Sequence, residues 1–281
     1  MAYSPLIEIP FPPGHFYSPY ADLADIEARR DVVFDRTVDP LGVDLREQRQ
    51  HELLAELAAY YPDIAYGENQ AEHLRYSFDN GMLGYADGTL LYLLLRHVKP
   101  RRLIEVGSGW SSALILDTVE AFDLDTELTF IEPHTERLDT LLTSKDRDRA
   151  TIIAQPVQAV DLTIFDTLQD GDILFIDSTH VSKVGSDVNL LFFEVLPRLA
   201  SGVHIHVHDI FFPFEYPEKW IAQGRAWSES YVLRAFLQFN QSFEVTLFAN
   251  MMQLRHRDWL DANLPLTLKN PAGSFWMRRT S

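Results

Sequence analysis

The chain has 281 residues, with 41 acidic against 24 basic side chains and a formal net charge of −17. A field of that sign repels polyanions, so we expect no nucleic-acid substrate. The absence of cysteine excludes disulfides, thiolate nucleophiles and cysteine-bound zinc. No apolar run is long enough to span a membrane, and the start lacks a basic region followed by an apolar segment, which together predict a soluble, cytoplasmic protein.

Residues 1–84 are expected to form an N-terminal elaboration. Residues 1–20 hold five prolines among aromatic side chains, as in an extended arm that packs on its own domain or on a neighbouring subunit of a homo-oligomer. Residues 44–60 have the apolar spacing of an amphipathic helix. The apolar run 89–98 predicts a buried helix that Asp87 can cap. We place the main domain at residues 85–281.

Residues 103–112 read Leu-Ile-Glu-Val-Gly-Ser-Gly-Trp-Ser-Ser and predict a strand, a glycine turn and the start of a helix over 111–122. Gly107 and Gly109 let the backbone approach a ligand, and the helix start offers it free N–H groups. Ser112 replaces the third glycine of a dinucleotide fingerprint, and Glu105 adds negative charge where a pyrophosphate would lie. S-adenosylmethionine (SAM), with a sulfonium and an amino group, suits this acid better.

Three further strands are expected at 128–131, 151–154 and 172–176, followed by a helix over 187–199 and a fifth strand at 203–208. Glu132 and Pro133 follow the second strand, where a carboxylate can accept both ribose hydroxyls of an adenosine. Gln158 lies in the loop after the third strand, and we expect it near the adenine.

The end of the chain predicts a helix over 229–239 and two strands at 243–248 and 274–278. The connection between these strands is too short and too polar for a well-formed crossover helix, which favours an antiparallel end to the sheet. The predicted fold is therefore a Rossmann-like, doubly wound α/β domain. Its sheet has seven mostly parallel strands with an antiparallel last strand, whereas a dinucleotide-binding fold would close with six parallel strands.

Acidic residues follow the fourth and fifth strands, which should be neighbours. Asp177 and Asp209 would both point into the crevice above the sheet, where a hard cation such as Mg²⁺ or Mn²⁺ could bridge them. His180, three residues after Asp177, is placed to take a proton from a substrate hydroxyl. His208 lies at the same edge of the sheet.

Residues 210–228 form an insertion after Asp209 that is rich in aromatic side chains. Its composition is typical of a lid over the acceptor, with Tyr216, Trp220 and Trp227 as substrate-binding candidates, or of a plug that packs on the sheet edge. Tyr85 and Asp87 are further candidates for acceptor binding.

These motifs resemble a known enzyme family over residues 85–280. The glycine turn resembles the first motif of class I SAM-dependent methyltransferases, and Asp177-x-x-His180 followed by His208-Asp209 is similar to metal-dependent sugar and natural-product O-methyltransferases. The resemblance implies that Asp177 and Asp209 hold Mg²⁺ and that His180 is the base. Ile210 departs from the pattern, because the family has a second oxygen ligand there, so the metal site is either completed by His208 or another residue, or absent. The cofactor-binding residues implied are Glu105, Gly107, Ser108, Gly109, Ser111, Glu132, Pro133, Gln158 and Asp177.

The expected activity is transfer of the SAM methyl group to a hydroxyl of a small polar or glycosidic acceptor. Two alternatives remain from the residues alone. A nicotinamide-dependent oxidoreductase could use the same glycine turn, although Glu105 and Ser112 count against it. A non-catalytic SAM-binding protein would keep the turn but would need no acids after the fourth and fifth strands.

Overall fold

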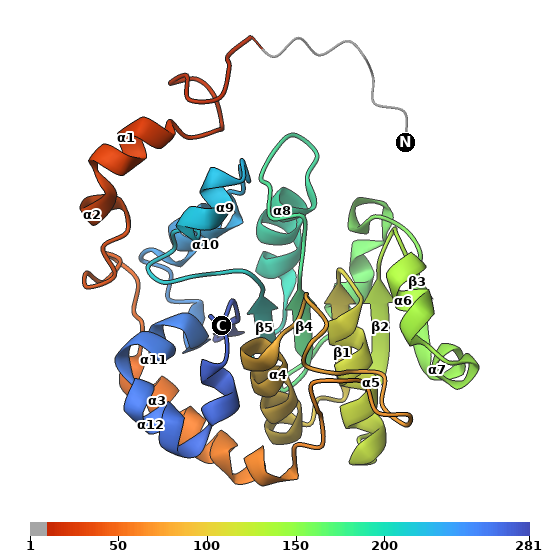
Figure 1. The fold of residues 1–281 in the computed structure, drawn as a ribbon. Coiled ribbons are helices and arrows are strands. Elements are labelled where there is room, and N and C mark those ends of the chain that lie inside the picture. The colour runs from red at the N-terminus through yellow and green to blue at the C-terminus, as the bar shows by residue number, and fades with distance from the viewer. Residues whose placement is uncertain (1–9) are drawn as a thin grey trace.

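The computed structural model describes residues 10–281 and has a seven-stranded sheet at its centre (Figure 1). The strand order is β3-β2-β1-β4-β5-β7-β6, in which β7 alone is antiparallel to its neighbours. The strands are β1 (Arg102–Val106), β2 (Glu127–Ile131), β3 (Ala150–Ile153), β4 (Ile173–Ile176), β5 (His204–Val207), β6 (Phe243–Phe248) and β7 (Phe275–Arg279). The predicted fold, mostly parallel with an antiparallel last strand, is confirmed.

Helices cover both faces of this sheet (Figure 1). The helices are α1 (Leu23–Ala28), α2 (Arg30–Val33), α3 (Glu47–Leu57), α4 (Tyr85–Val98), α5 (Trp110–Ala121), α6 (Glu136–Leu141), α7 (Ser144–Arg149), α8 (Asp187–Leu190), α9 (Glu218–Ala222), α10 (Glu229–Leu237), α11 (Ala249–Arg255) and α12 (Arg257–Asn263). Short 3₁₀ segments lie at Ala58–Asp63, Val157–Ala159, Leu162–Thr167, Leu196–Arg198 and Pro265–Leu268. Within residues 10–281, no helix is long and apolar enough to cross a membrane.

The central strands are apolar because both of their faces are covered. Every residue of β4 is buried, as expected for a parallel strand between two helical layers. On one face α4 packs beside α5. On the other, α8 continues as a π-helical turn, Leu191–Val195, whose Phe192 meets Phe236 of α10 edge to face at 5.8 Å.

Three predicted elements need correction. The helix expected over 89–98 begins at Tyr85, so Asp87 lies in its first turn rather than at its cap. The helix expected over 187–199 changes to π and then 3₁₀ geometry and ends at Arg198. The polar connection between β6 and β7 contains α11 and α12, although no well-formed helix was expected there.

Residues 10–84 pack along one edge of the sheet and over its carboxyl end. Gln50 of α3 is buried, and its side-chain oxygen accepts the backbone N–H of Phe248 at 2.6 Å. By contrast, α1 and α2 contain no buried residue. Arg30 of α2 makes a two-point ion pair with Glu218, at 2.8 and 3.1 Å, which ties the arm to α9. Residues 1–9 of the predicted arm lie outside the described range.

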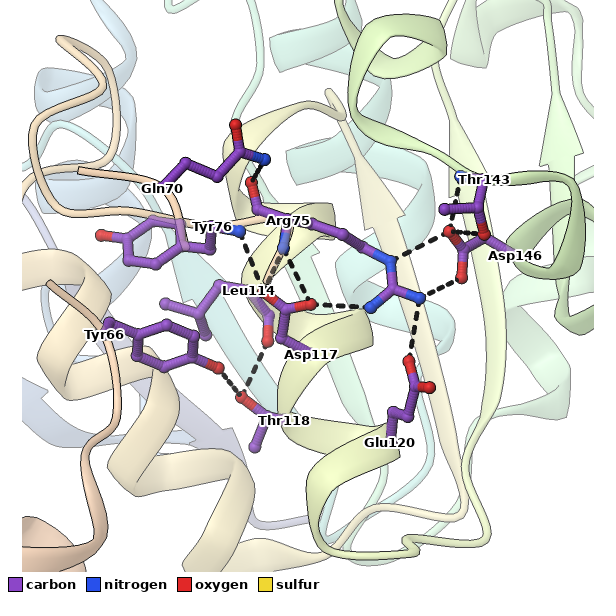
Figure 2. Close-up of polar contacts among 10 residues, drawn as sticks. All are labelled: Tyr66, Gln70, Arg75, Tyr76, Leu114, Asp117, Thr118, Glu120, Thr143 and Asp146. Carbon is purple, nitrogen blue, oxygen red and sulfur yellow. Dashed lines mark hydrogen bonds and ion pairs between the residues drawn. The ribbon is translucent and has the colours of Figure 1, made fainter. Parts of the chain in front are cut away.

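Arg75 joins the segment before α4 to α5, the helix that follows the glycine turn, and to α7 (Figure 2). Its guanidinium donates to Asp117 of α5 at 2.7 Å and to Asp146 of α7 at 2.6 and 2.9 Å. Asp117 also accepts the backbone N–H groups of Arg75 and Tyr76. Because both carboxylates are almost completely buried, this cation holds three separate chain segments together.

Candidate active site

The loop after β1 has a conformation that only glycine allows. Gly107 has a φ of 86°, and a Cβ built on it would lie 1.9 Å from the carbonyl oxygen of Asp177 on the neighbouring strand. Ser112, in the place of the third glycine, accepts the Gly109 N–H at 3.0 Å and donates its hydroxyl hydrogen to Glu105. The sequence folds here as strand, turn and helix because these contacts close the turn without a third glycine.

Glu105 lies beneath the glycine loop and does not line the cavity above it. Its side chain is fully buried, and burial raises its pKa to about 8 despite hydrogen bonds from Ser111 and Ser112 that act in the opposite direction. We expected this carboxylate to meet the amino group of SAM. Alternate residues of β1 point to opposite faces and Glu105 turns toward α5, so this contact stays a prediction and would have to be made from beneath the loop.

Glu132 supports the same loop from the end of β2. One carboxylate oxygen accepts the Ser108 N–H at 3.1 Å, and the other accepts the His134 N–H at 2.7 Å. The side chain is partly exposed and lines the cavity above the loop. A carboxylate is therefore fixed beside Gly107, as its spacing predicts, with lone pairs left for a ligand.

A cavity of about 600 Å³ opens over the carboxyl ends of β1, β2, β4 and β5. The predicted residues that line it are Gly107, Ser108, Gly109, Ser111, Glu132, Asp177, His180, His208, Asp209, Trp220 and Trp227. The structure thus brings together the glycine loop, the strand-end acids and two aromatic residues of the insertion.

Besides Glu105, five predicted residues do not line this cavity. Gln158 is exposed and donates to the carbonyl of Gly185 at 3.2 Å, and Pro133 is exposed beside Glu132. The side chains of the remaining three are engaged in contacts within the protein. Tyr85 stacks on Phe78 at 4.7 Å, the Asp87 carboxylate accepts hydrogen bonds from Gly273 and Ser274, and the Tyr216 hydroxyl accepts the Ser230 N–H at 3.0 Å.

His180 stands between the two strand-end acids. Its Nε2 is 3.4 Å from Asp177 Oδ1 and 3.6 Å from Asp209 Oδ2, while its Nδ1 is 2.8 Å from Glu229 Oε2. His180 and Asp209 both have positive φ, at 62° and 58°. Left-handed backbone is uncommon for residues other than glycine and concentrates at functional sites, where the surrounding structure holds it in place.

The charges around His180 favour its protonated form. Burial alone would lower the pKa of the imidazole, but the hydrogen bonds and negative charges of Asp177 and Glu229 raise it well above its ordinary value. Burial would also raise the pKa of Asp177, but the nearby His208 and His180 lower it. Burial raises the pKa of Asp209. The cluster therefore holds an imidazolium beside an ionised Asp177.

The predicted metal site is not formed by these side chains. Among residues 10–281, no group of three or more His, Cys, Asp or Glu side chains is arranged to hold a metal ion. The His180 ring stands between Asp177 and Asp209, where a bridging cation would have to bind, and His208 Nε2 lies 3.8 Å from Asp209. This arrangement does not fit a divalent ion, so we derive no step through one.

The first part of the insertion packs in the core, and its later part lines the cavity. Trp220 meets Trp227 edge to face at 5.1 Å, and Trp227 meets the His180 ring at 4.4 Å. Phe212 and Phe214, by contrast, are fully buried in the core. The beginning of the insertion is therefore a packing element, and residues after 217 form the part that faces the cavity.

A family model described as a methyltransferase domain matches residues 104–210, which run from β1 to just beyond Asp209. A curated relative from Archaeoglobus fulgidus, an uncharacterized protein, is 33% identical over 171 residues. That alignment covers 58% of this chain and 76% of the relative. The chain belongs to the methyltransferase family that this model describes.

Three methyltransferases of known structure are similar to this one. PaMTH1 from Podospora anserina, bound to S-adenosylhomocysteine (SAH), is 14% identical over 91% of this chain and 96% of its own, with a TM-score of 0.47. The plantazolicin methyltransferase BpumL is 12% identical over 83% and 99%, with a TM-score of 0.48. A Geobacter sulfurreducens methyltransferase is 16% identical over 92% and 96%, with a TM-score of 0.40. The assignment rests on the sequence matches, not on these likenesses.

The sequence interpretation missed two residues of this methyltransferase's site, one behind His180 and one in the cavity wall. Glu229 holds His180 from α10, 49 positions away in the sequence, and Ser178 donates to its other oxygen at 2.8 Å. Arg137 of α6 lines the cavity next to Gly109. Neither belongs to a local motif, so only the fold reveals them.

Proposed function

We propose that this methyltransferase transfers the SAM methyl group to a hydroxyl of a small acceptor, and that His180 takes the hydroxyl proton. One observation carries the proposal. The His180 Nδ1 is tied to the buried Glu229, whereas its Nε2 faces the cavity that the glycine loop also lines. A histidine held in this way has one nitrogen oriented by a carboxylate and the other free to exchange a proton with a substrate.

The glycine loop and Glu132 are the residues that we assign to cofactor binding. The missing Cβ of Gly107 lets the loop lie directly against the Asp177 carbonyl, and the buried Ser108 hydroxyl has no hydrogen-bond partner among residues 10–281, so the loop fits a polar ligand. Glu132 would accept the ribose hydroxyls. When bound there, SAM supplies an electron-poor methyl carbon on its sulfonium. The protein's part is to align an acceptor oxygen with that carbon and to exclude water.

His180 must lose its resting proton before it can act as a base. Its raised pKa means that turnover should rise with pH through a value above that of an ordinary histidine. Removing the Glu229 charge removes one cause of the raised pKa. We therefore expect the Glu229→Gln variant to reach its maximal rate at lower pH than the wild type does.

Trp220 and Trp227 favour an acceptor with a flat or ring-shaped body. Both indoles line the cavity near His180, and aromatic faces stack on apolar ring surfaces. A glycosidic acceptor, with one sugar ring against Trp227 and its hydroxyl toward His180, is the specific form that the composition of the insertion supports.

The test compares His180→Ala and Glu229→Gln with the control His73→Ala, which removes an exposed histidine remote from the cavity. SAH release from SAM is measured over a panel of hydroxylated acceptors, and SAH affinity is measured by calorimetry. His180→Ala should lower turnover by roughly 10² to 10⁴ while SAH affinity stays nearly unchanged. Turnover within threefold of wild type would remove His180 from the proposal.

A further inference from the structure

A second cavity adjoins the one above the glycine loop. It has a volume of about 620 Å³ and lies between residues 13–33 of the arm and residues 215–231. Its walls are largely apolar and include Pro19, Leu23, Ile26, Val33, Ile221 and Ala222. Arg225 and Trp227 line both cavities. These two side chains therefore lie between the two spaces.

Arg225 forms the centre of this partition. Its guanidinium carbon lies 4.4 Å from the Trp220 ring and 4.8 Å from the Trp227 ring. A cation at this distance from an aromatic ring is attracted by the ring without a hydrogen bond, so the contact does not use up the N–H donors of the guanidinium. Within residues 10–281, no carboxylate lies within ion-pair distance of Arg225, and no side-chain hydrogen bond from it is formed. Its donors are therefore available to a ligand.

The nearby acids of the insertion are already engaged elsewhere. Glu218 pairs with Arg30 of α2, and Glu215 accepts the Tyr231 hydroxyl hydrogen. The chain as a whole carries a net charge of −17, yet a cation with free donors stands where the two cavities meet. Such a group suits a single oxyanion, which can accept two parallel N–H bonds from guanidinium.

We propose that the acceptor is a hydroxylated compound with one anionic group, which Arg225 binds, and an apolar body that occupies the second cavity. This inference rests on the proposed function and specifies its substrate class. The charges that line the first cavity also determine which end of the acceptor faces His180. Asp177 and Asp209 at the strand edge repel the anionic end, so the anion stays at Arg225 and the hydroxyl faces His180.

A matched pair of fluorescent probes separates the anion from the apolar body. 1-Anilinonaphthalene-8-sulfonate carries an apolar body with one anionic group, and N-phenyl-1-naphthylamine is the same body without it. Each probe is titrated into protein saturated with SAH, and energy transfer from tryptophan reports binding. The variants are Arg225→Gln and Arg225→Lys, with Lys219→Gln as a control that removes an equal charge from the exposed face of α9.

We expect the sulfonate probe to bind wild-type protein at one site, at least tenfold more tightly than the neutral probe does. Arg225→Gln should remove this preference, Arg225→Lys should keep part of it, and Lys219→Gln should leave it intact. Equal affinity of the two probes for wild-type protein, no binding, or an unchanged preference in Arg225→Gln would overturn the proposal. Melting curves must show that each variant is folded at the titration temperature.

A second pair of variants tests the location of the apolar body. Ile26→Glu places a charge in the second cavity and should weaken both probes, whereas Val32→Glu changes an exposed residue of the same arm and should weaken neither. Equal effects of the two substitutions would refute the placement. Displacement by 1-naphthaleneacetic acid against 1-naphthyl phosphate then tells whether Arg225 prefers a carboxylate or a phosphate. SAH affinity, measured on the same samples, reports separately whether the protein binds the cofactor product that the proposed function requires.

Discussion

Replacing Arg75 with Met should destabilise the fold by about 3 to 5 kcal/mol. The substitution keeps an apolar stem but leaves Asp117 and Asp146 buried without their cation, and their side chains are only 1% and 3% exposed. Removing one partner of a buried ion pair costs about this much, because the remaining charge stays out of water. The pair with Glu120, which is 62% exposed, should contribute little.

The loss should depend on pH in a defined direction. With Arg75 present, burial already raises the pKa of Asp117, while Arg75 and Thr143 outweigh burial and lower the pKa of Asp146. Without Arg75 both carboxyl groups should have folded-state pKa values above their unfolded values. Such groups bind protons more readily in the folded state, so their unfavourable effect grows as pH rises. The variant should therefore lose more stability at pH 8 than at pH 5.

Urea unfolding followed by circular dichroism at both pH values measures these losses. At about 2 °C per kcal/mol, the midpoint of thermal unfolding should also fall by roughly 6 to 10 °C. Arg49→Met serves as control, because its pair with Glu52 is exposed and should change stability by less than about 0.5 kcal/mol. A loss below 1 kcal/mol in Arg75→Met, or an equal loss at both pH values, would refute the reasoning.

Three further predictions concern the cavity itself. In the wild type, the folded-state pKa of Glu105 is raised to about 8, so this carboxyl group ionises on unfolding and the free energy of unfolding falls between pH 4.5 and about 8. Glu105→Gln should remove this fall. Urea unfolding across the same pH range measures it, and a fall that persists in the variant would contradict the assignment to Glu105. Gly107→Ala should weaken SAH binding at least tenfold in calorimetry, because its Cβ meets the Asp177 carbonyl; unchanged affinity would contradict the loop geometry. Treatment with EDTA should leave turnover unchanged, because His180 stands between the strand-end acids; lost activity that Mg²⁺ restores would show that His180 moves aside.

Local sequence patterns predicted the strand, turn and helix around Gly107, because consecutive residues carry that information. They also placed Asp177 and Asp209 together, since parallel strands end at one edge of a sheet. Glu229 could not be predicted, because its contact with His180 depends on how α10 packs and no pattern marks it. The hydrogen bonds that the Asp87 carboxylate accepts from Gly273 and Ser274, just before β7, could not be predicted for the same reason.

The backbone of His180 holds the end of the insertion, whereas Gly224, nearer its middle, has open space beside it. Its carbonyl oxygen accepts the N–H groups of Ser228 and Glu229, at 2.8 and 3.1 Å, so the start of α10 is tied to His180. Gly224, by contrast, has nothing within 4 Å of the position where a Cβ would stand. Changes of length or composition near Gly224 can therefore alter which acceptor enters without displacing His180, so the enzyme can diverge in substrate while its chemistry stays the same.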